Sequence, residues 1–357
     1  MSKLKARLAG REKIADATYA FTLEPHEAPF AYRAGQNVDI TVPELKYPDP
    51  AGNKRTFTVA NAPGYGGFLV ATRARGSGLK QTLVEAPLGL EVAVDGPYGS
   101  FTLPQKPSEV VMLAGGVGIT PFRAMVEDSM ERSLDHTLSL IHSSRTPEEA
   151  PFLEELLRWG MESAQEMSTG KRVRRRRHGH ESPTAWGAGG ARLGAGGAGV
   201  GGGAGGGGAS AGAGGGLGGE PSTSESAELR EHMGGPGDHS GGSGGMARAD
   251  AHGMTRADSF ALGPAPATGT STLAAGTGRP RFVYIPTMTQ AARSARGWKG
   301  ESRRIDADFL ARVLPLNRET PWYYVAGPPR FVAGGVESLK HLGIDEDRIR
   351  FEEFPGY

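Results

Sequence analysis

The chain has 357 residues and a formal net charge of +1, so its charge predicts no general attraction to nucleic acid or to an anionic membrane. It contains no cysteine, which excludes disulfides, cysteine-ligated iron–sulfur clusters, thiolate zinc sites and a cysteine nucleophile on this chain. No run reaches about 18 consecutive apolar residues, and the N-terminus alternates like a strand. We therefore expect a cytoplasmic protein with no membrane span and no signal peptide. Because the histidines show no paired helical spacing, we also expect no metal site.

Residues 1–104 predict an all-β module. Short runs rich in β-branched and aromatic residues are separated by Gly, Pro and Asn turns, a pattern typical of a small barrel. One segment, 79–87, has helical spacing. The predicted strands are 17–25, 36–42, 55–61, 67–74 and 90–96.

From residue 109 the pattern changes to strands that alternate with helices, which predicts βαβ units and a parallel sheet. We assign this α/β domain to residues 105–357. Its predicted strands are 109–116, 137–144, 281–289, 322–328 and 349–354. Its predicted helices are 120–133, 147–159, 306–314 and 330–343.

A long segment at 161–279 interrupts the α/β domain. It holds most of the 56 glycines and few large apolar residues, so it cannot bury enough surface to offset its chain entropy. We predict a disordered insert between a helix ending near Trp159 and a strand starting at Arg281. The basic run at 171–180 lies in this low-complexity context, which favours a solvated charge run over a nucleic-acid contact.

The stretch GGVGITP at 115–121 follows a buried-type strand. Gly116 and Gly118 permit a ligand to approach the backbone at the carboxyl end of a parallel strand, where open α/β sheets bind ligands. Thr120 suits a helix N-cap and Pro121 the first helical position. The stretch is not the dinucleotide fingerprint G-x-G-x-x-G, because Pro121 stands at the third glycine position. The alternative is a tight strand-to-helix turn without a ligand.

Three further clusters carry polar or aromatic chemistry. In KRTFTVANAP (54–63), Arg55 can pair with a phosphate and Phe57 can stack on a planar ring, although an ordinary amphipathic strand has the same pattern. In YYVAGPPRFV (323–332), Gly327 marks a second glycine loop at a strand end. The segment RFEEFPGY (350–357) offers the carboxylates of Glu352 and Glu353.

Taken in this order, the motifs resemble those of the ferredoxin–NADP reductase superfamily. RTFT is similar to its Arg-x-aromatic-Ser/Thr flavin motif, and RGSGLKQTL with VDGPYGSFTLP to its flavin-phosphate loop and barrel end. GGVGITP is similar to its nicotinamide-nucleotide loop, and AGPPRFV to its Cys-Gly-Pro-Pro motif. The resemblance covers essentially all residues outside the insert. It implies an antiparallel β-barrel FAD domain followed by an α/β parallel-sheet nucleotide-binding domain.

The resemblance implies two groups of cofactor-binding residues. For FAD, it implies that Arg55 binds the pyrophosphate, that Phe57 flanks the flavin ring and that Thr58 forms a hydrogen bond near flavin N5. It also implies that the FAD phosphates are bound by the loop of Gly76, Ser77 and Gly78. For NAD(P)H, it implies contacts from Gly116, Gly118, Thr120, Gly327 and Pro328. The residues implied at the hydride-transfer site are Thr58, Glu352 and Tyr357, the last as a cover over the flavin.

The implied activity is hydride transfer from NAD(P)H to FAD, with electrons passed on to a separate acceptor such as a ferredoxin-like carrier. Two alternatives are a non-catalytic flavin- or nucleotide-binding scaffold and a reductase of free flavins or quinones. We expect a monomer.

Two departures from the family pattern concern the nucleotide side. Ala326 stands where the family has cysteine. Thr287 and Met288 align with a Ser-Arg pair that reads the 2′-phosphate of NADP in plant-type members. Arg293 and Arg296 either replace this pair in binding the 2′-phosphate or are solvated loop cations. The sequence therefore does not decide between NADH and NADPH as the substrate.

Overall fold

The computed structural model describes residues 2–27, 30–169, 281–314, 317 and 319–355. These residues belong to one compact unit of the chain. The part of the predicted insert from residue 170 onward and the predicted flavin cover, Tyr357, lie outside the described residues.

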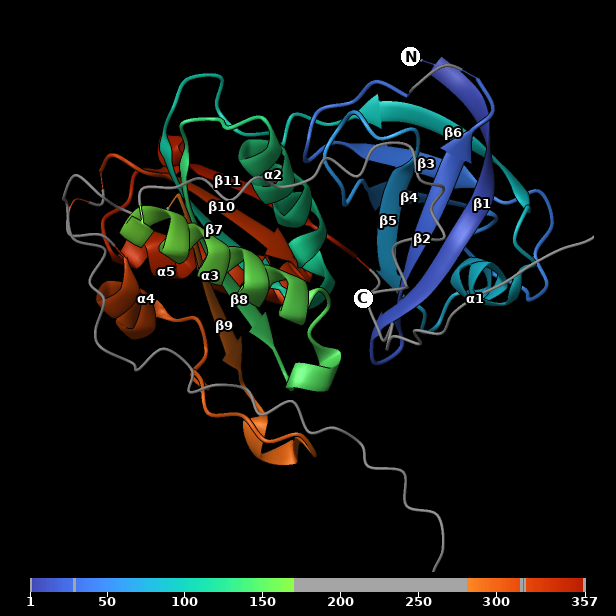
Figure 1. Cartoon of the computed structure of the whole chain (residues 1–357). Helices are drawn as coiled ribbons and strands as arrows, with labels where there is room; N and C mark the ends of the chain where they lie inside the picture. Colours follow the sequence, from blue (N-terminus) through green and yellow to red (C-terminus); the bar gives the residue numbers. More distant parts are fainter. Residues whose placement is uncertain (1, 28–29, 170–280, 315–316, 318, 356–357) are drawn as a thin grey trace, which may run out of the picture. The chain divides into compact units, whose positions relative to one another are not determined.

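The first sheet is antiparallel and has six strands in the order β4-β3-β6-β1-β2-β5. An isolated antiparallel bridge joins Val59, directly after β4, to Val70 of β5. A single helix, α1 (Gly78–Glu85), precedes β6 (Figure 1). The strands are β1 (Ser2–Ala15), β2 (Thr18–Pro25), β3 (Asn37–Thr41), β4 (Lys54–Thr58), β5 (Phe68–Arg73) and β6 (Glu91–Tyr98).

The second sheet is parallel and has five strands in the order β11-β10-β7-β8-β9. Its strands are β7 (Glu109–Gly115), β8 (Thr137–Ser144), β9 (Phe282–Met288), β10 (Trp322–Gly327) and β11 (Ile349–Glu353). Its helices are α2 (Thr120–Glu131), α3 (Leu153–Thr169), α4 (Ala307–Val313) and α5 (Pro329–His341). The predicted fold class, an antiparallel barrel sheet followed by a parallel α/β sheet, is confirmed.

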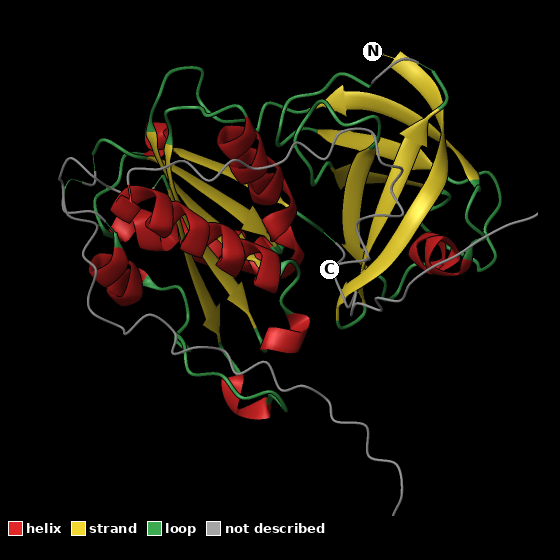
Figure 2. Cartoon of the chain, in the orientation of Figure 1, coloured by secondary structure: helices red, strands yellow, loops and turns green. Residues whose placement is uncertain are grey.

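Helices cover both faces of the parallel sheet (Figure 2). Side chains alternate along a strand, so successive residues of β7 enter two different cores. Val110 and Met112 pack with residues of α2 and α3, whereas Val111 and Leu113 pack with residues of α4 and α5. Both faces of the sheet are therefore apolar at β7, and this strand reads as a continuous hydrophobic run.

Helix α3 differs from the sequence prediction at both ends. Pro147–Glu149 forms a separate 3-10 turn, and α3 starts at Leu153 and continues to Thr169, well past the predicted end near Trp159. Ser163 explains the extra length, because its buried hydroxyl oxygen accepts a 3.0 Å hydrogen bond from the backbone N–H of Phe282 at the start of β9. Among the described residues, no helix is long and apolar enough to cross a membrane.

Candidate functional site

The two glycine loops lie next to each other at the point where the strand order reverses. The chain runs from β7 outward to β8 and β9, and then returns to β10 on the other side of β7. Ligands of open α/β sheets bind outside the carboxyl ends of the strands at such a reversal. The loop after β7 starts at Gly116, and β10 ends at Gly327, followed by Pro328. The structure thus brings these three predicted residues together.

Gly116 and Gly118 of the first loop are each glycine for a different structural reason. A Cβ atom on Gly118 would lie 2.4 Å from the carbonyl oxygen of Ala326, so this glycine permits close packing of the loop against the end of β10. Gly116 has φ +52°, and a Cβ atom there would meet nothing within 4 Å. Gly116 therefore faces open space, whereas Gly118 is buried against backbone.

Thr120 is not the N-cap that the sequence predicts. A 3-10 turn, Gly116–Ile119, precedes α2, and Thr120 already has helical dihedrals. Its hydroxyl donates to the carbonyl oxygen of Val117 at 3.2 Å, and its side chain is buried. The 3-10 turn displaced the cap because the glycines let the chain tighten before the helix. Thr120 therefore stabilises the loop from within.

A buried histidine supports the glycine loop from below. The Nε2 atom of His142, at the end of β8, lies 3.0 Å from the carbonyl oxygen of Gly116, and its Nδ1 lies 2.9 Å from the hydroxyl of Tyr284. Since a carbonyl only accepts, Nε2 carries the proton and Nδ1 accepts from Tyr284. Burial lowers the pKa of His142 to about 4, so the ring is neutral at pH 7.

A second group of residues centres on Asn37 at the start of β3. Asn37 pairs with Thr58 of β4 in the antiparallel register, and its side-chain amide donates to Glu352 Oε1 at 3.2 Å. The structure therefore connects two predicted site residues, Thr58 and Glu352, through Asn37. Asn37 was not predicted as a site residue, because a polar residue at the start of a strand belongs to no recognisable motif.

Two polar atoms of this group are buried without a partner in the described part of the chain. They are the hydroxyl oxygen of Thr58 and the Oε2 atom of Glu352. An unmet buried polar group is costly, so these atoms mark a place suited to a polar ligand. Burial also raises the pKa of Glu352 to about 7, although the hydrogen bond from Asn37 opposes the shift.

Phe57 has a different position from the one expected. Its side chain is 2% exposed and belongs to the barrel core, together with Val38 and Val59. No open face of the ring is available to a flavin in this conformation. The alternation that places Thr58 toward Asn37 turns Phe57 to the opposite side of β4.

Arg55, also on β4, is held by the loop that precedes its strand. Its guanidinium donates to Asp49 Oδ1 at 2.5 Å and to the carbonyl oxygens of Ala51, Gly52 and Lys54 at 2.7, 3.0 and 2.6 Å. The predicted phosphate ligand is thus already paired with a carboxylate.

The predicted phosphate cradle lies at the start of α1. Ser77 is the N-cap residue, and its hydroxyl oxygen accepts from the backbone N–H of Lys80 at 3.3 Å. Gly76 has φ +67° and faces open space. A Cβ atom on Gly78 would lie 2.4 Å from the carbonyl oxygen of Tyr47, so Gly78 permits the loop before β4 to pack on the helix start.

A buried ion cluster holds α2 against the segment that follows β4. Arg123 is 1% exposed and forms two 2.8 Å bonds to Glu155. It also donates to the carbonyl oxygen of Ala60 at 2.6 Å, while Glu127 accepts from the backbone N–H of Ala62 at 2.7 Å. These bonds fix the segment that begins directly after Thr58.

Thr287 and Met288, which align with the family's 2′-phosphate-reading pair, carry no positive charge, and the candidate substitutes Arg293 and Arg296 each bond to a neighbouring side chain. Thr287 and Met288 are fully buried, and the Thr287 hydroxyl donates to the carbonyl oxygen of Arg303. Arg293 donates to the Gln290 side chain at 2.6 Å, and Arg296 pairs with Glu154 at 3.0 Å.

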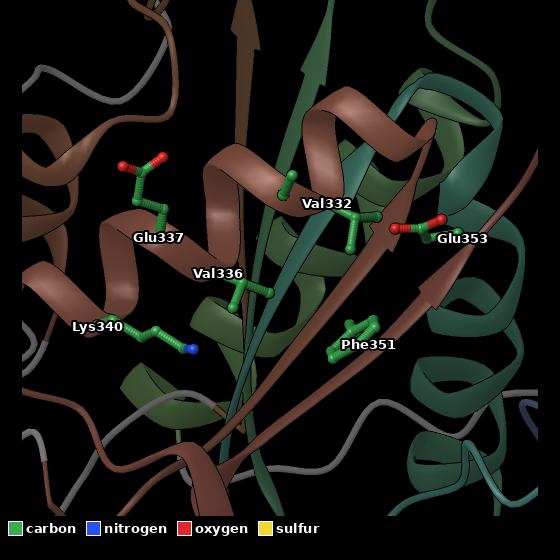
Figure 3. A pocket seen from close by; sticks show the side chains of 7 residues that line it. Val332, Val336, Glu337, Lys340, Phe351 and Glu353 are labelled. Atoms are coloured by element: carbon green, nitrogen blue, oxygen red, sulfur yellow. The ribbon is translucent and has the colours of Figure 1, made fainter.

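A shallow groove of about 310 Å³ lies between α5 and β11 (Figure 3). Val332 and Val336 of α5 line it together with Phe351 of β11, and Glu337, Lys340 and Glu353 bring charges to it. None of the predicted site residues lines it. Glu352 belongs instead to the Asn37 group.

Comparisons with known proteins add information on the sequence and the fold. A family model described as an oxidoreductase NAD-binding domain matches residues 112–183. The chain is 28% identical over 159 residues to a phthalate dioxygenase reductase from Burkholderia cepacia, covering 43% of this chain and 47% of that protein. It is 31% identical over 131 residues to ferredoxin–NADP reductase B from Sorangium cellulosum, covering 36% of this chain and 52% of that protein.

Solved structures show the same fold at low identity. A ferredoxin NADP+ reductase from Neisseria gonorrhoeae with bound FAD and NADP has a TM-score of 0.56 and 14% identity, with 99% of each chain covered. The alignments with the two curated relatives span about half of each relative's length. Residues 112–183 therefore match the oxidoreductase NAD-binding domain family, and the chain has the fold of a ferredoxin NADP+ reductase.

Proposed function

We propose that this protein is an FAD-dependent NAD(P)H oxidoreductase that passes electrons to a separate carrier protein. The unpartnered hydroxyl of Thr58 and the unpartnered Oε2 of Glu352, joined through Asn37, carry the proposal. A flavin ring presents both hydrogen-bond donors and acceptors along its edge, which suits one hydroxyl and one carboxyl group. Relatives named as a dioxygenase reductase and as a dioxygenase electron transfer component support the separate acceptor.

On the flavin side, this chain's residues bind and orient. The Thr58 hydroxyl donates to the reactive edge of the ring, held in place by the strand pairing of Asn37 with Thr58. Arg55 and the start of α1, at Gly76 and Ser77, hold the phosphates. Phe57 is not among the proposed contacts, because it lies in the barrel core.

On the nucleotide side, backbone rather than side chains forms the contact surface. Gly116 and Gly327 both have positive φ values, and a Cβ atom on Gly116 would point into open space. We propose that Gly116, Gly327 and Pro328 contact the nicotinamide nucleotide. Gly118 and Thr120 act indirectly, by packing and bonding within the loop.

When bound, FAD supplies an acceptor for the nicotinamide hydride and a store from which two electrons leave one at a time. Glu352 holds or releases a proton near pH 7, because burial raises its pKa to about 7. The Asn37 amide donates to Glu352 Oε1 and leaves Oε2 free for the ligand. We further propose a monomer that works in the cytoplasm.

Reconstitution with FAD tests this proposal. We expect the full chain to retain FAD on gel filtration and its flavin absorbance to bleach on addition of NADH or NADPH. Thr58→Val should slow bleaching while FAD stays bound. Thr56→Val is the matched control, because the Thr56 hydroxyl donates to Asp39 at 2.5 Å on the same strand pair. A protein that stays colourless after FAD is added would contradict the proposal, and bound FAD without nucleotide oxidation would favour a scaffold.

A further inference from the structure

The carboxylate of Asp49 is bonded on both of its oxygens. Oδ1 accepts from Arg55 at 2.5 Å and from the backbone N–H of Ala51 at 3.1 Å. Oδ2 accepts from the Ser77 hydroxyl at 2.7 Å and from the backbone N–H of Leu79 at 3.0 Å. The side chain is 3% exposed. One carboxylate thus joins the predicted phosphate ligand, Arg55, to the predicted phosphate cradle at Ser77.

The backbone delivers this carboxylate to the helix start. Gly78 has no side chain, and the carbonyl oxygens of Tyr47 and Pro48 lie where its Cβ atom would stand, at 2.4 and 2.5 Å. The loop before β4 therefore packs directly on the first residue of α1. Asp49 follows at once and caps the free N–H group of Leu79.

The surroundings of Asp49 are those of an anion site. Arg55 donates to it, and Lys80 is close enough that Asp49 raises its pKa while burial and Arg55 lower it to about 8. The hydrogen bonds from Leu79 and Ser77 hold the pKa of Asp49 well below its usual range, so it stays charged at pH 7. Two cations, a serine hydroxyl and a helix N-terminus are ligands typical of a phosphate group.

We propose that Asp49 is a built-in competitor of the flavin phosphate, which a phosphate-bearing flavin must displace from Arg55 and Ser77 in order to bind. The inference rests on the proposed function, because it takes Arg55 and the start of α1 as the flavin-phosphate site. Asp49 then sets how strongly the protein distinguishes flavins with phosphate from flavins without it. Its side chain lowers the affinity for FAD and FMN but leaves the affinity for riboflavin unchanged.

Titration of the full-length apoprotein with FAD, FMN and riboflavin, followed by flavin fluorescence, tests the inference. Asp49→Asn keeps the size and a carbonyl acceptor but removes the charge. We expect it to tighten FMN and FAD binding at least about tenfold, equal to about 1.4 kcal/mol, with riboflavin affinity unchanged. Asp16→Asn is the matched control, because it removes the same charge from an exposed pair with Lys13.

The riboflavin measurement separates this role from a purely structural one. If Asp49 served only to cap α1, Asp49→Asn would weaken all three flavins alike, and that result would overturn the inference. Unchanged FMN and FAD affinities would overturn it as well, while flavin binding by the wild type would leave the proposed function standing. If neither protein binds any of the three flavins, both proposals fail.

A second neutral variant keeps the inference testable if Asp49→Asn does not fold. Asp49→Ser removes the charge and retains a hydroxyl acceptor, and it should shift FMN and FAD affinity in the same direction. Circular dichroism of both variants verifies that they fold. Failure of both to fold would show that the carboxylate is required where it stands, and this would contradict displacement.

Discussion

The glycine loops before α2 and α1 are built in opposite ways, although both are proposed to contact a ligand. The loop at Gly116–Thr120 contains no charged side chain, and α2 starts without a side-chain cap. The loop at Gly76–Gly78 leads into α1, which Ser77 and Asp49 both cap, with Arg55 paired to the same carboxylate.

The difference teaches that a glycine loop is not by itself an open ligand site. At the end of β7, Gly116 faces open space and its backbone is the surface on offer. At the start of α1, the groups suited to binding an anion already bind the carboxylate of Asp49. Substitutions that affect one loop and spare the other therefore test the comparison.

The largest effect is expected on the nucleotide loop. Gly118→Ala places a methyl group where only 2.4 Å separates it from the Ala326 carbonyl oxygen, so the loop must move away from β10. We expect a loss of about 3 kcal/mol in the free energy of unfolding, measured by urea denaturation. Gly334→Ala in α5 is the control, since nothing lies within 4 Å of its Cβ position. A gain of about 0.5–1 kcal/mol is expected there.

The next largest effect is expected at His142, which bonds to the backbone of the same loop. His142→Leu leaves the Gly116 carbonyl and the Tyr284 hydroxyl without their buried partner. We expect a loss of about 2 kcal/mol in stability and weaker NAD(P)H binding, with flavin affinity unchanged. His26→Leu, at an exposed pair with Glu91, should change neither quantity. Equal weakening of flavin and nucleotide binding would show that the loops are not independent.

The flavin-phosphate loop should respond to loss of its cation. Arg55→Ala removes the proposed phosphate ligand, and we expect FAD affinity to fall about tenfold, or about 1.4 kcal/mol. Affinity for NAD(P)H should change much less, as isothermal titration with each ligand will measure. Arg7→Ala, which breaks an exposed pair with Glu24, serves as the control. An unchanged FAD affinity would remove Arg55 from the site.

The smallest effect concerns Glu352. Burial raises its pKa to about 7, above its ordinary value, so the folded protein holds a proton that the unfolded chain releases between about pH 4.5 and 7. Stability is therefore lost as pH rises through this window. Glu352→Gln should flatten the dependence and raise stability at pH 8 by about 1 kcal/mol. Urea denaturation at pH 5 and 8 measures this, with the exposed neighbour Glu353→Gln as control.

Strand and helix positions were largely readable from the sequence, most clearly for β7 and β10, whose buried runs each end at a glycine. The end of α3 was missed, since its last turns carry few apolar residues and depend on the bond from Phe282 to Ser163. Thr120 was misplaced as an N-cap because a 3-10 turn is not visible in local composition.

The site was predictable where a motif names its residues and hidden where contacts cross the sequence. Thr58 and Glu352 were expected, but the link through Asn37 joins positions 37 and 352, which no local pattern connects. Asp49 lies in the sequence PDPAGN, which reads as a turn. Its role follows from the packing of that turn on Gly78.

The most direct test of the central claim is anaerobic stopped-flow absorbance of the FAD-loaded protein mixed with NADH or NADPH. We predict that the flavin absorbance bleaches in a single turnover with at least one of the two nucleotides, and that a separate one-electron acceptor restores it. A flavin spectrum that neither nucleotide changes would contradict the account.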